Sequence, residues 1–227
     1  PKCSVLSISN SKSPKPRIYS LGTTNLPQVR SCSDLGVIID DKLTFSNHIL
    51  STTKKAYTQS AMMSRCFLSK NPHLLTRAFT SYVRPILEYA SPVWSPHFAK
   101  GIDSLERVQR RFTKSFHNLR SLPYSTRIER LNLQPLHIRR LNIDLTTCYR
   151  LIHELTHLDS TLFFILRSHS VTRGHPFTLT KPLVRLNTNK FSFFSRTIDP
   201  WNNLPLLSVT SGSLPAFKFK LKYPPAV

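Results

Sequence analysis

The spacing of apolar residues divides the chain into a short strand-like start and a longer helical part. Residues 1–44 hold brief apolar stretches separated by turns, a pattern typical of short strands. From Ser46 the apolar positions recur every three or four residues, as on one face of a helix. Ser46 is placed to cap the start of this helix. Its apolar face is predicted to consist of Ile49, Ala56, Met63 and Phe67.

Two further helices follow in the pattern. One begins at Asn71, a capping residue followed by Pro72 at the first helical position, and Pro85 is expected to kink or end it. The next opens at Asp103 and has two different sides. Its apolar side carries Ile102, Leu105, Val108, Phe112 and Phe116, and its basic side carries Arg107, Arg110, Arg111 and Lys114.

The last hundred residues are less regular. A long helix is marked by Ile138, Leu141, Leu145, Tyr149 and Ile152. Beyond residue 158 the pattern indicates mixed strand and loop, and a basic closing helix is predicted around residues 213–222. The predicted fold is therefore mostly α with a small β portion: strands in 1–44, a helical bundle in 45–122 and an α+β region in 123–227.

Charge narrows the class of partner. The chain has 32 Lys and Arg against 11 Asp and Glu, a net charge of +21 spread over its length. Such an excess favours a polyanionic ligand, nucleic acid first and an anionic membrane second. The longest apolar run is five residues, 162–166, whereas a membrane-spanning helix needs about 20. We therefore expect RNA and DNA as partners and no membrane.

The termini and cysteines indicate where the protein acts. No secretory leader or other targeting signal is visible, and the start at Pro1 without a Met suggests a fragment of a longer protein. Cys3, Cys32, Cys66 and Cys148 lie far apart without a CxxC pair. They are interpreted as reduced intracellular thiols, not as a disulfide framework or a zinc knuckle.

One motif points to a different chemistry. Residues 153–157 read HELTH, which matches the HExxH of zinc peptidases, where two histidines one helical turn apart bind the metal. A third ligand is missing, because Phe163 and Ser160 occupy the places of the usual histidine and glycine. We therefore favour the alternative that His153 and His157 are polar positions at a helix end. The pair Asp40 and Asp41 is likewise interpreted as a turn that ends a strand.

Several phrases, in order, resemble the region downstream of the catalytic motif in reverse transcriptases of LINE-type, non-LTR retrotransposons, especially Jockey-like and chicken-repeat-type elements. The resemblance covers nearly the whole chain. It is carried by KCSVL, SDLGVIIDDKLTFSNHI, SYVRPILEYASPVWSP, IDSLERVQRRFTKSF, LNLQPLHIRRLNIDLTTCYRLIH, TRGH, SRTIDPWNNLP and SLPAFKFKL.

The resemblance implies an organisation and an activity. Residues 1–44 would be palm-edge strands with a primer-grip-like segment, 45–122 a helical thumb and 123–227 a post-thumb region. The family is an RNA-directed DNA polymerase that uses two magnesium ions held by palm aspartates in an (F/Y)xDD motif, which this sequence lacks. The chain would therefore have no cofactor and no polymerase activity of its own. Its partners would be a template-primer duplex and the palm, fingers and endonuclease of the same polyprotein.

Contact residues follow from the same resemblance and from the basic helix. Expected backbone contacts are Lys54, Lys55, Arg107, Arg110, Arg111 and Lys114. Leu35, Gly36 and Val37 form the primer-grip-like segment, where glycine would let the backbone approach nucleic acid closely. Trp94 and Trp201 either stack on bases or, as is more frequent in such loops, pin a loop to the core. The protein is expected inside the cell, in the nucleus and cytoplasm, as part of a ribonucleoprotein.

Two alternatives remain open. A stand-alone basic RNA-binding structural protein would explain the charge equally well. A zinc peptidase built on HELTH is disfavoured but can be tested by metal analysis.

Overall fold

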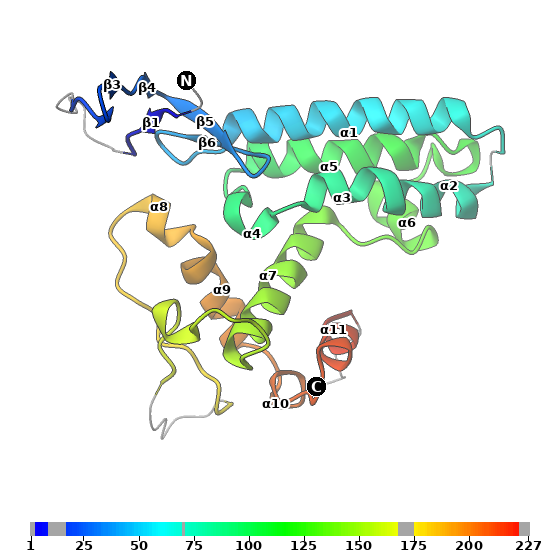
Figure 1. Ribbon diagram of the computed structural model, residues 1–227. Coiled ribbons are helices and arrows are strands. Elements are labelled where there is room, and N and C mark those ends of the chain that lie inside the picture. The colour runs from blue at the N-terminus through cyan, green and yellow to red at the C-terminus, as the bar shows by residue number, and fades with distance from the viewer. Residues whose placement is uncertain (1–2, 9–16, 70, 168–174, 223–227) are drawn as a thin grey trace. The chain divides into compact units, whose positions relative to one another are not determined.

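A computed structural model describes residues 3–8, 17–69, 71–167 and 175–222. Helices predominate, and the named strands all fall between residues 5 and 40, so the prediction of a mostly α fold with a small β portion is confirmed (Figure 1). The chain forms two compact units. Unit 1 combines residues 1–90 with 96–133, and unit 2 combines residues 91–95 with 134–227. The three-part division expected from the resemblance stays a prediction.

Among the described residues of unit 1, the strands form three short two-stranded ribbons. Two ribbons are antiparallel and one is parallel. The pairs are β1 (Val5–Leu6) with β4 (Gln28–Val29), β2 (Ser20–Leu21) with β3 (Thr24–Asn25), and β5 (Ser31–Asp34) with β6 (Val37–Asp40). The last ribbon leads directly into the helical part of the unit.

The β5–β6 ribbon is a hairpin with a two-residue turn. Leu35 and Gly36 have φ angles of 44° and 82°, so both central residues of the turn are left-handed, as hairpin twist favours. Gly36 adopts this conformation without strain, whereas Leu35 does not. The hydroxyl of Tyr89 donates a hydrogen bond of 2.9 Å to the carbonyl of Leu35 and holds the turn against the helices.

Asp40 shapes the entry into the first helix. Its carboxylate accepts the backbone N–H groups of Thr44 and Phe45 at 3.0 and 2.7 Å. Helix α1 (Ser46–Cys66) begins after Phe45, which has a φ of 54° and is the residue before the first turn. The expectation that Ser46 caps this helix is wrong, because Ser46 is already the first helical residue and its own N–H donates to the hydroxyl of Thr44 at 3.3 Å. The interpretation of Asp40 and Asp41 as a strand-ending turn is confirmed.

Helix α1 packs along α5 (Ala99–Lys114). The predicted apolar face of α1 is confirmed at Ile49, Ala56 and Met63, which are all buried. A side chain at Gly101 of α5 would place its Cβ 3.3 Å from Ile49 and 2.9 Å from the Cβ of Pro96. Glycine therefore permits the close approach of the two helices at this point.

The segment after α1 follows its sequence signals closely. The side chain of Asn71 accepts the N–H of His73 at 2.9 Å and caps α2 (Pro72–Ala78), as predicted. The helical path then widens into one π-helical turn, η1 (Phe79–Val83), before α3 (Arg84–Glu88). Pro85 has no N–H to continue a regular helix, so the predicted disturbance takes the form of this wide turn.

Helix α5 forms the centre of unit 1. It begins four residues before the predicted Asp103, and its apolar side buries Leu105, Val108 and Phe112 as expected. The ring of Phe112 stacks on Phe79 with centroids 4.1 Å apart, which joins α5 to η1. The turn η2 (His117–Leu119) and α6 (Tyr124–Arg130) complete the unit.

Unit 2 is built around α7 (Leu136–Ile152) and α9 (Phe193–Asn202). Its shorter elements are α4 (Ser91–Trp94), η3 (Ser160–Leu162), α8 (Asn187–Lys190), α10 (Leu206–Val209) and α11 (Leu214–Lys222). Where strands were expected, the described residues of this unit contain one isolated bridge between Leu166 and Leu179. The α+β character predicted for this region is therefore not seen in its described part.

Both tryptophans are core residues of unit 2. Trp94 and Trp201 are 1% and 0% exposed, and the indole N–H of Trp201 donates to the carbonyl of Phe177 at 2.8 Å. Trp201 therefore ties the segment at Phe177 to the core, and neither buried ring is available to stack on a base. Arg196 makes a two-pronged pair with Asp144, at 2.9 and 3.0 Å, and also reaches the carbonyl of Pro92.

Candidate nucleic-acid interface

The basic side of α5 is partly neutralised by an acid on the same helix. Asp103 pairs with Arg107 at 2.6 Å and with Arg110 at 2.9 Å. Hydrogen bonds from these two guanidinium groups lower the pKa of Asp103, and the Asp103 carboxylate in turn raises the pKa of Arg107. Two of the four arginine and lysine residues predicted on this helix therefore already have a partner.

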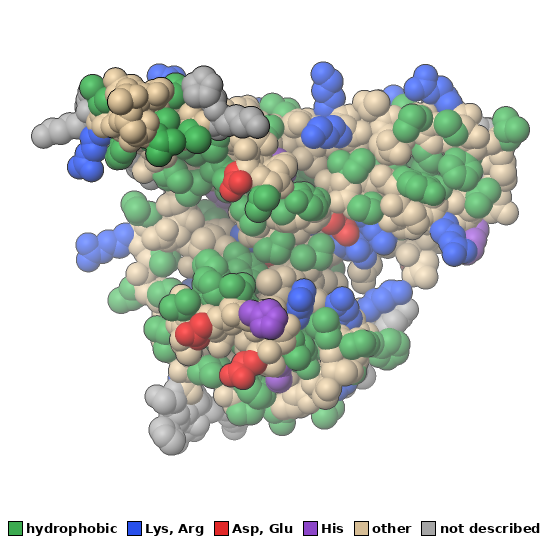
Figure 2. Space-filling model, in the orientation of Figure 1, with side chains coloured by type: hydrophobic (Ala, Val, Ile, Leu, Met, Phe, Trp, Pro, Cys, Tyr) green, Lys and Arg blue, Asp and Glu red, His purple; other side chains and the backbone are tan. Residues whose placement is uncertain are grey.

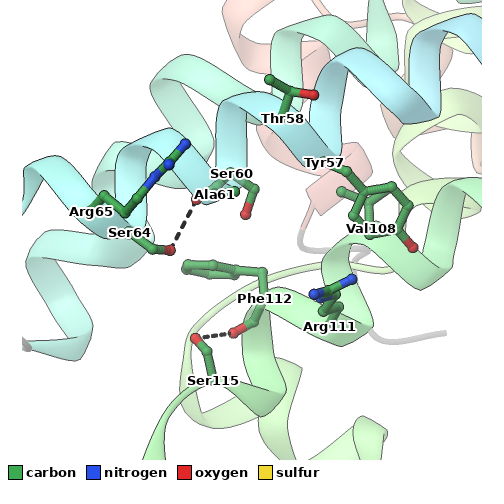
Figure 3. Close-up of a pocket in the computed structure, with 10 residues that line it drawn as sticks. All are labelled: Tyr57, Thr58, Ser60, Ala61, Ser64, Arg65, Val108, Arg111, Phe112 and Ser115. Atoms are coloured by element: carbon green, nitrogen blue, oxygen red, sulfur yellow. Dashed lines mark hydrogen bonds between the residues drawn. The ribbon is translucent and has the colours of Figure 1, made fainter.

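The other two basic residues predicted on α5 have no such partner. Arg111 and Lys114 are exposed and form no ion pair with any described residue. Arg111 lies beside a groove of about 670 Å³ between α1 and α5, which we call the α1–α5 groove (Figure 3). No Asp or Glu is among the ten residues that line it. A concave surface that carries cations and lacks acids is suited to an anionic ligand.

Arginines from both helices border the α1–α5 groove. Arg65, near the end of α1, and Arg111 of α5 lie on either side of the ring of Phe112 (Figure 3). The guanidinium of Arg111 also lies over the ring of Tyr57, 5.7 Å from its centroid. Neither arginine forms an ion pair within the described part of the chain. Both can therefore bind phosphate oxygens without breaking an existing pair.

The rest of the lining is apolar or hydroxyl-bearing. Phe112 and Val108 are buried and form the floor. Ser64 and Ser115 donate their hydroxyl hydrogens to backbone carbonyls of their own helices, at 2.9 and 2.7 Å (Figure 3). These hydroxyls are therefore occupied as donors, and the arginines are left as the main groups for anion contact.

The basic face of α1 continues the groove. Lys54, Thr58, Ala61 and Arg65 are spaced by four, three and four residues and share one side of the helix. Lys54 and its neighbour Lys55 are exposed, as a phosphate contact requires. Basic side chains project from the edge of the molecule where Figure 1 places α1, as Figure 2 shows. The prediction from sequence missed Arg65, although its helical spacing from Lys54 was a signal for it.

The segment predicted to be primer-grip-like, residues 35–37, occupies the β5–β6 turn and the start of β6. Leu35 is 83% exposed, Gly36 is exposed and Val37 is buried. A Cβ on Gly36 would lie 3.6 Å from the ring of Tyr89, an ordinary contact, so the glycine is required here for its φ angle and not for space. The three residues do not line the α1–α5 groove.

The HELTH motif does not adopt the geometry of a zinc peptidase. Helix α7 ends at Ile152, and Glu154 has a left-handed φ of 53°, so His153 and His157 are not one helical turn apart on a continuous helix. His153 contacts the carbonyl of Val209 at 2.9 Å and stacks near Tyr149. The interpretation as a polar position at a helix end is confirmed for His153, the residue directly after α7, whereas His157 lies five residues beyond the end of the helix. No metal-binding group of three His, Cys, Asp or Glu occurs among the described residues.

Other predicted features have structural outcomes as well. Thr172, Arg173 and Gly174 of the TRGH phrase lie outside the described residues. All four cysteines are free, and burial raises the pKa of the Cys148 thiol, which makes it a poor nucleophile. Within the described part of the chain, the helices are too short or too polar to cross a bilayer.

Comparison with known proteins gives one sequence match. The chain is 25% identical over 123 residues to an uncharacterized protein of Caenorhabditis elegans, and the match covers 53% of this chain. It covers 62% of the relative, so less than two thirds of that protein is represented. No protein-family model and no solved structure matches the chain.

Proposed function

We propose that this chain binds the sugar-phosphate backbone of a nucleic-acid duplex, as the thumb and post-thumb part of a non-LTR retrotransposon reverse transcriptase. The observation that carries the proposal is the α1–α5 groove, where Arg65 and Arg111 flank a surface without acids. The net charge of +21 and the ordered phrases of the sequence support the same conclusion.

Backbone contact of this kind positions a duplex without reading its sequence. Arginine guanidinium groups bind phosphate oxygens in a planar, two-pronged geometry, and Lys54, Lys55 and Lys114 add point charges beside them. Each phosphate neutralised releases bound cations, so affinity falls as salt rises. The exposed turn at Leu35 and Gly36 is the proposed primer-grip-like contact, where no side chain at Gly36 stands between the backbone and a ligand.

The chain does not supply the chemistry of polymerisation. The family holds its two magnesium ions with palm aspartates, and the adjacent pair Asp40 and Asp41 does not fit that role. Asp40 accepts three backbone N–H groups, from Lys42, Thr44 and Phe45, and is committed to the turn before α1. The proposal therefore places synthesis on a palm outside this sequence.

Binding to a blunt RNA–DNA duplex tests the proposal. We expect the Arg65→Gln/Arg111→Gln variant to lose about tenfold in affinity and about two units of slope in log affinity against log salt. A variant with the same loss of charge outside the groove, Arg120→Gln/Arg150→Gln, controls for net charge, because both residues are exposed. An equal loss in both variants would show that the groove is not the contact surface.

The reading frame upstream of Pro1 separates this proposal from a stand-alone RNA-binding protein. A palm with an (F/Y)xDD motif in the same frame supports the polymerase. A start codon directly before this sequence, with its own promoter, would remove the polymerase and leave only nucleic-acid binding.

A further inference from the structure

A second groove in unit 1 lies between α2 and the end of α6, and we call it the α2–α6 groove. It has a volume of about 700 Å³ and shares no residue with the α1–α5 groove. Its lining comes from the start and length of α2, from Thr80 of η1 and from residues 130–133. The basic and polar members are Asn71, His73, Thr76, Arg77, Thr80, Arg130 and Asn132, and no acid lines the groove.

The charges of this groove are unpaired. Arg77 and Arg130 are exposed, and neither forms an ion pair with a described residue. Glu129 precedes Arg130 in the chain, yet it is exposed, does not line the groove and does not pair with it. Arg84, by contrast, lies close to α2 in sequence and is paired with Glu88 at 3.9 Å. The two groove arginines are therefore available to a ligand.

The wall that carries Arg130 is held in place by α5. The hydroxyl of Tyr124, at the start of α6, donates to the buried carboxylate of Glu106 and accepts from Gln109 at 3.0 Å. After Arg130 the chain turns at Asn132, whose φ is 50°. The N–H of Leu133 then donates a hydrogen bond of 2.8 Å to the carbonyl of Ile128 in α6. The groove therefore exists before a ligand arrives, which reduces the entropy lost on binding.

A hydroxyl of the opposite wall has no hydrogen-bond partner. Thr76 lines the groove from α2, and its Oγ1 is buried without a partner among the described residues. Thr80, one helical turn later, does have one, because its hydroxyl donates to the carbonyl of Arg77 at 2.9 Å. Buried polar atoms rarely lack a partner, so the Thr76 hydroxyl is an unsatisfied group within the wall of the groove.

We infer that the α2–α6 groove binds a second phosphodiester segment of the nucleic acid, separate from the segment at the α1–α5 groove. Two unpaired arginines facing one hollow match the phosphate oxygens of a sugar-phosphate backbone. The volume is within the range of about 300–1,000 Å³ that ligand pockets occupy. The identity of the ligand rests on the proposed function, whereas the position of the site rests on the groove residues alone.

A length series of RNA–DNA duplexes tests it with the full chain. Affinity and salt slope are measured from about 6 to about 30 base pairs, because short ligands fill one groove and long ligands reach both. For long duplexes we expect the Arg77→Gln/Arg130→Gln variant to lose about two units of salt slope and about tenfold in affinity. For the shortest duplexes we expect it to match the wild type. Arg77→Lys/Arg130→Lys keeps the charge and is expected to retain the slope.

Two results would separate the second phosphate site from the proposed function. If Arg77→Gln/Arg130→Gln behaves like the Arg120→Gln/Arg150→Gln control at every length while Arg65→Gln/Arg111→Gln is weakened, the second site is absent and the proposed function stands. If the wild type binds no duplex of any length, the proposed function fails and the phosphodiester assignment fails with it. Thermal unfolding of each variant checks that these exposed substitutions leave the fold intact.

Discussion

At the scale of single residues, Asp103 controls how much of the basic side of α5 can meet a ligand. Its carboxylate holds Arg107, which is exposed, and Arg110, which is half-buried. In Asp103→Asn the two guanidinium groups lose their anionic partner and become free for phosphate. We therefore expect duplex affinity to rise about three- to tenfold at low salt, with a steeper salt dependence, measured by fluorescence anisotropy.

The matched control for Asp103 lies in unit 2. Glu154 is exposed and forms no ion pair with a described residue, so Glu154→Gln removes the same charge without releasing an arginine. We expect this control to change affinity much less. If the two variants gain equally, net charge alone governs binding and the pairing on α5 is irrelevant.

Gly36 is the residue on which the hairpin turn depends. Its φ of 82° is favourable for glycine, and an alanine would pay about 1–2 kcal/mol for the same backbone conformation. The new methyl group would make only an ordinary contact, 3.6 Å from Tyr89, so the loss would come from the backbone. We expect Gly36→Ala to lower the free energy of unfolding by about that amount in a urea titration.

Gly212→Ala is the comparison for this strain. A Cβ at Gly212 meets no atom within 4 Å, and Gly212 does not have the left-handed φ of Gly36. Its effect on the free energy of unfolding should stay within about 0.5 kcal/mol. Equal losses at the two glycines would mean that the turn is not strained by a side chain.

At the scale of elements, His48 joins β6 to α1. Its Nδ1 accepts the N–H of Ile38 at 3.2 Å, which requires that nitrogen to be unprotonated. Burial lowers the pKa of His48, and the positive charge of Lys55 lowers it further. His48 therefore takes up its proton at a lower pH in the folded protein than in the unfolded chain, where its pKa has the ordinary value of 6.5.

The sign of the pH effect follows from that difference. A depressed pKa in the folded state gives stability that is present above about pH 6.5 and is lost as the pH falls toward the folded-state pKa. We expect the free energy of unfolding to drop between about pH 7.5 and pH 5.5. The drop should shrink in His48→Gln and persist in His137→Gln, which replaces an exposed histidine. A drop of the same size in both variants would assign the effect to other groups.

The elements were predictable where local chemistry decides them. The spacing of Ile49, Ala56 and Met63 predicted a buried face, and Asn71 with Pro72 predicted a helix start, because each signal acts within one or two turns. Ser46 misled because Asp40, in the preceding strand, fixes the turn at Phe45 and so makes Ser46 the first residue inside α1. The π-helical turn before Pro85 was not predictable from spacing alone, since proline signals a disturbance but not its form.

The site was predictable in part for the same reason. A basic side of α5 follows from helical spacing, and Arg111 and Lys114 do remain exposed. Arg65 of α1 lies in the same groove because of the way α1 and α5 pack together. This packing could not be predicted from helical spacing. The α2–α6 groove joins residues more than fifty positions apart, Arg77 and Arg130, and required the structure to be seen.

At the scale of the whole molecule, net charge is the dominant electrostatic fact. A charge of +21 remains after all 11 acidic residues are counted against the 32 Lys and Arg, and it repels itself in the compact state. Salt screens this repulsion over about 10 Å at 0.1 M. We therefore expect the unfolding temperature to rise by several degrees as NaCl increases from about 50 to about 300 mM.

A polyanion should stabilise the fold by binding to it and not by screening its charge, so its effect should depend on salt in the opposite direction. A ligand that binds the folded state raises the unfolding temperature by an amount that grows with the ratio of its concentration to its Kd, and the affinity of phosphate contacts falls with salt. We expect an RNA–DNA duplex to raise the unfolding temperature most at low NaCl and to lose that effect at high NaCl, in differential scanning fluorimetry. The Arg65→Gln/Arg111→Gln variant should retain the rise caused by NaCl and lose most of the rise caused by the duplex. If the duplex stabilises this variant as much as the wild type, charge attracts the ligand without the α1–α5 groove holding it.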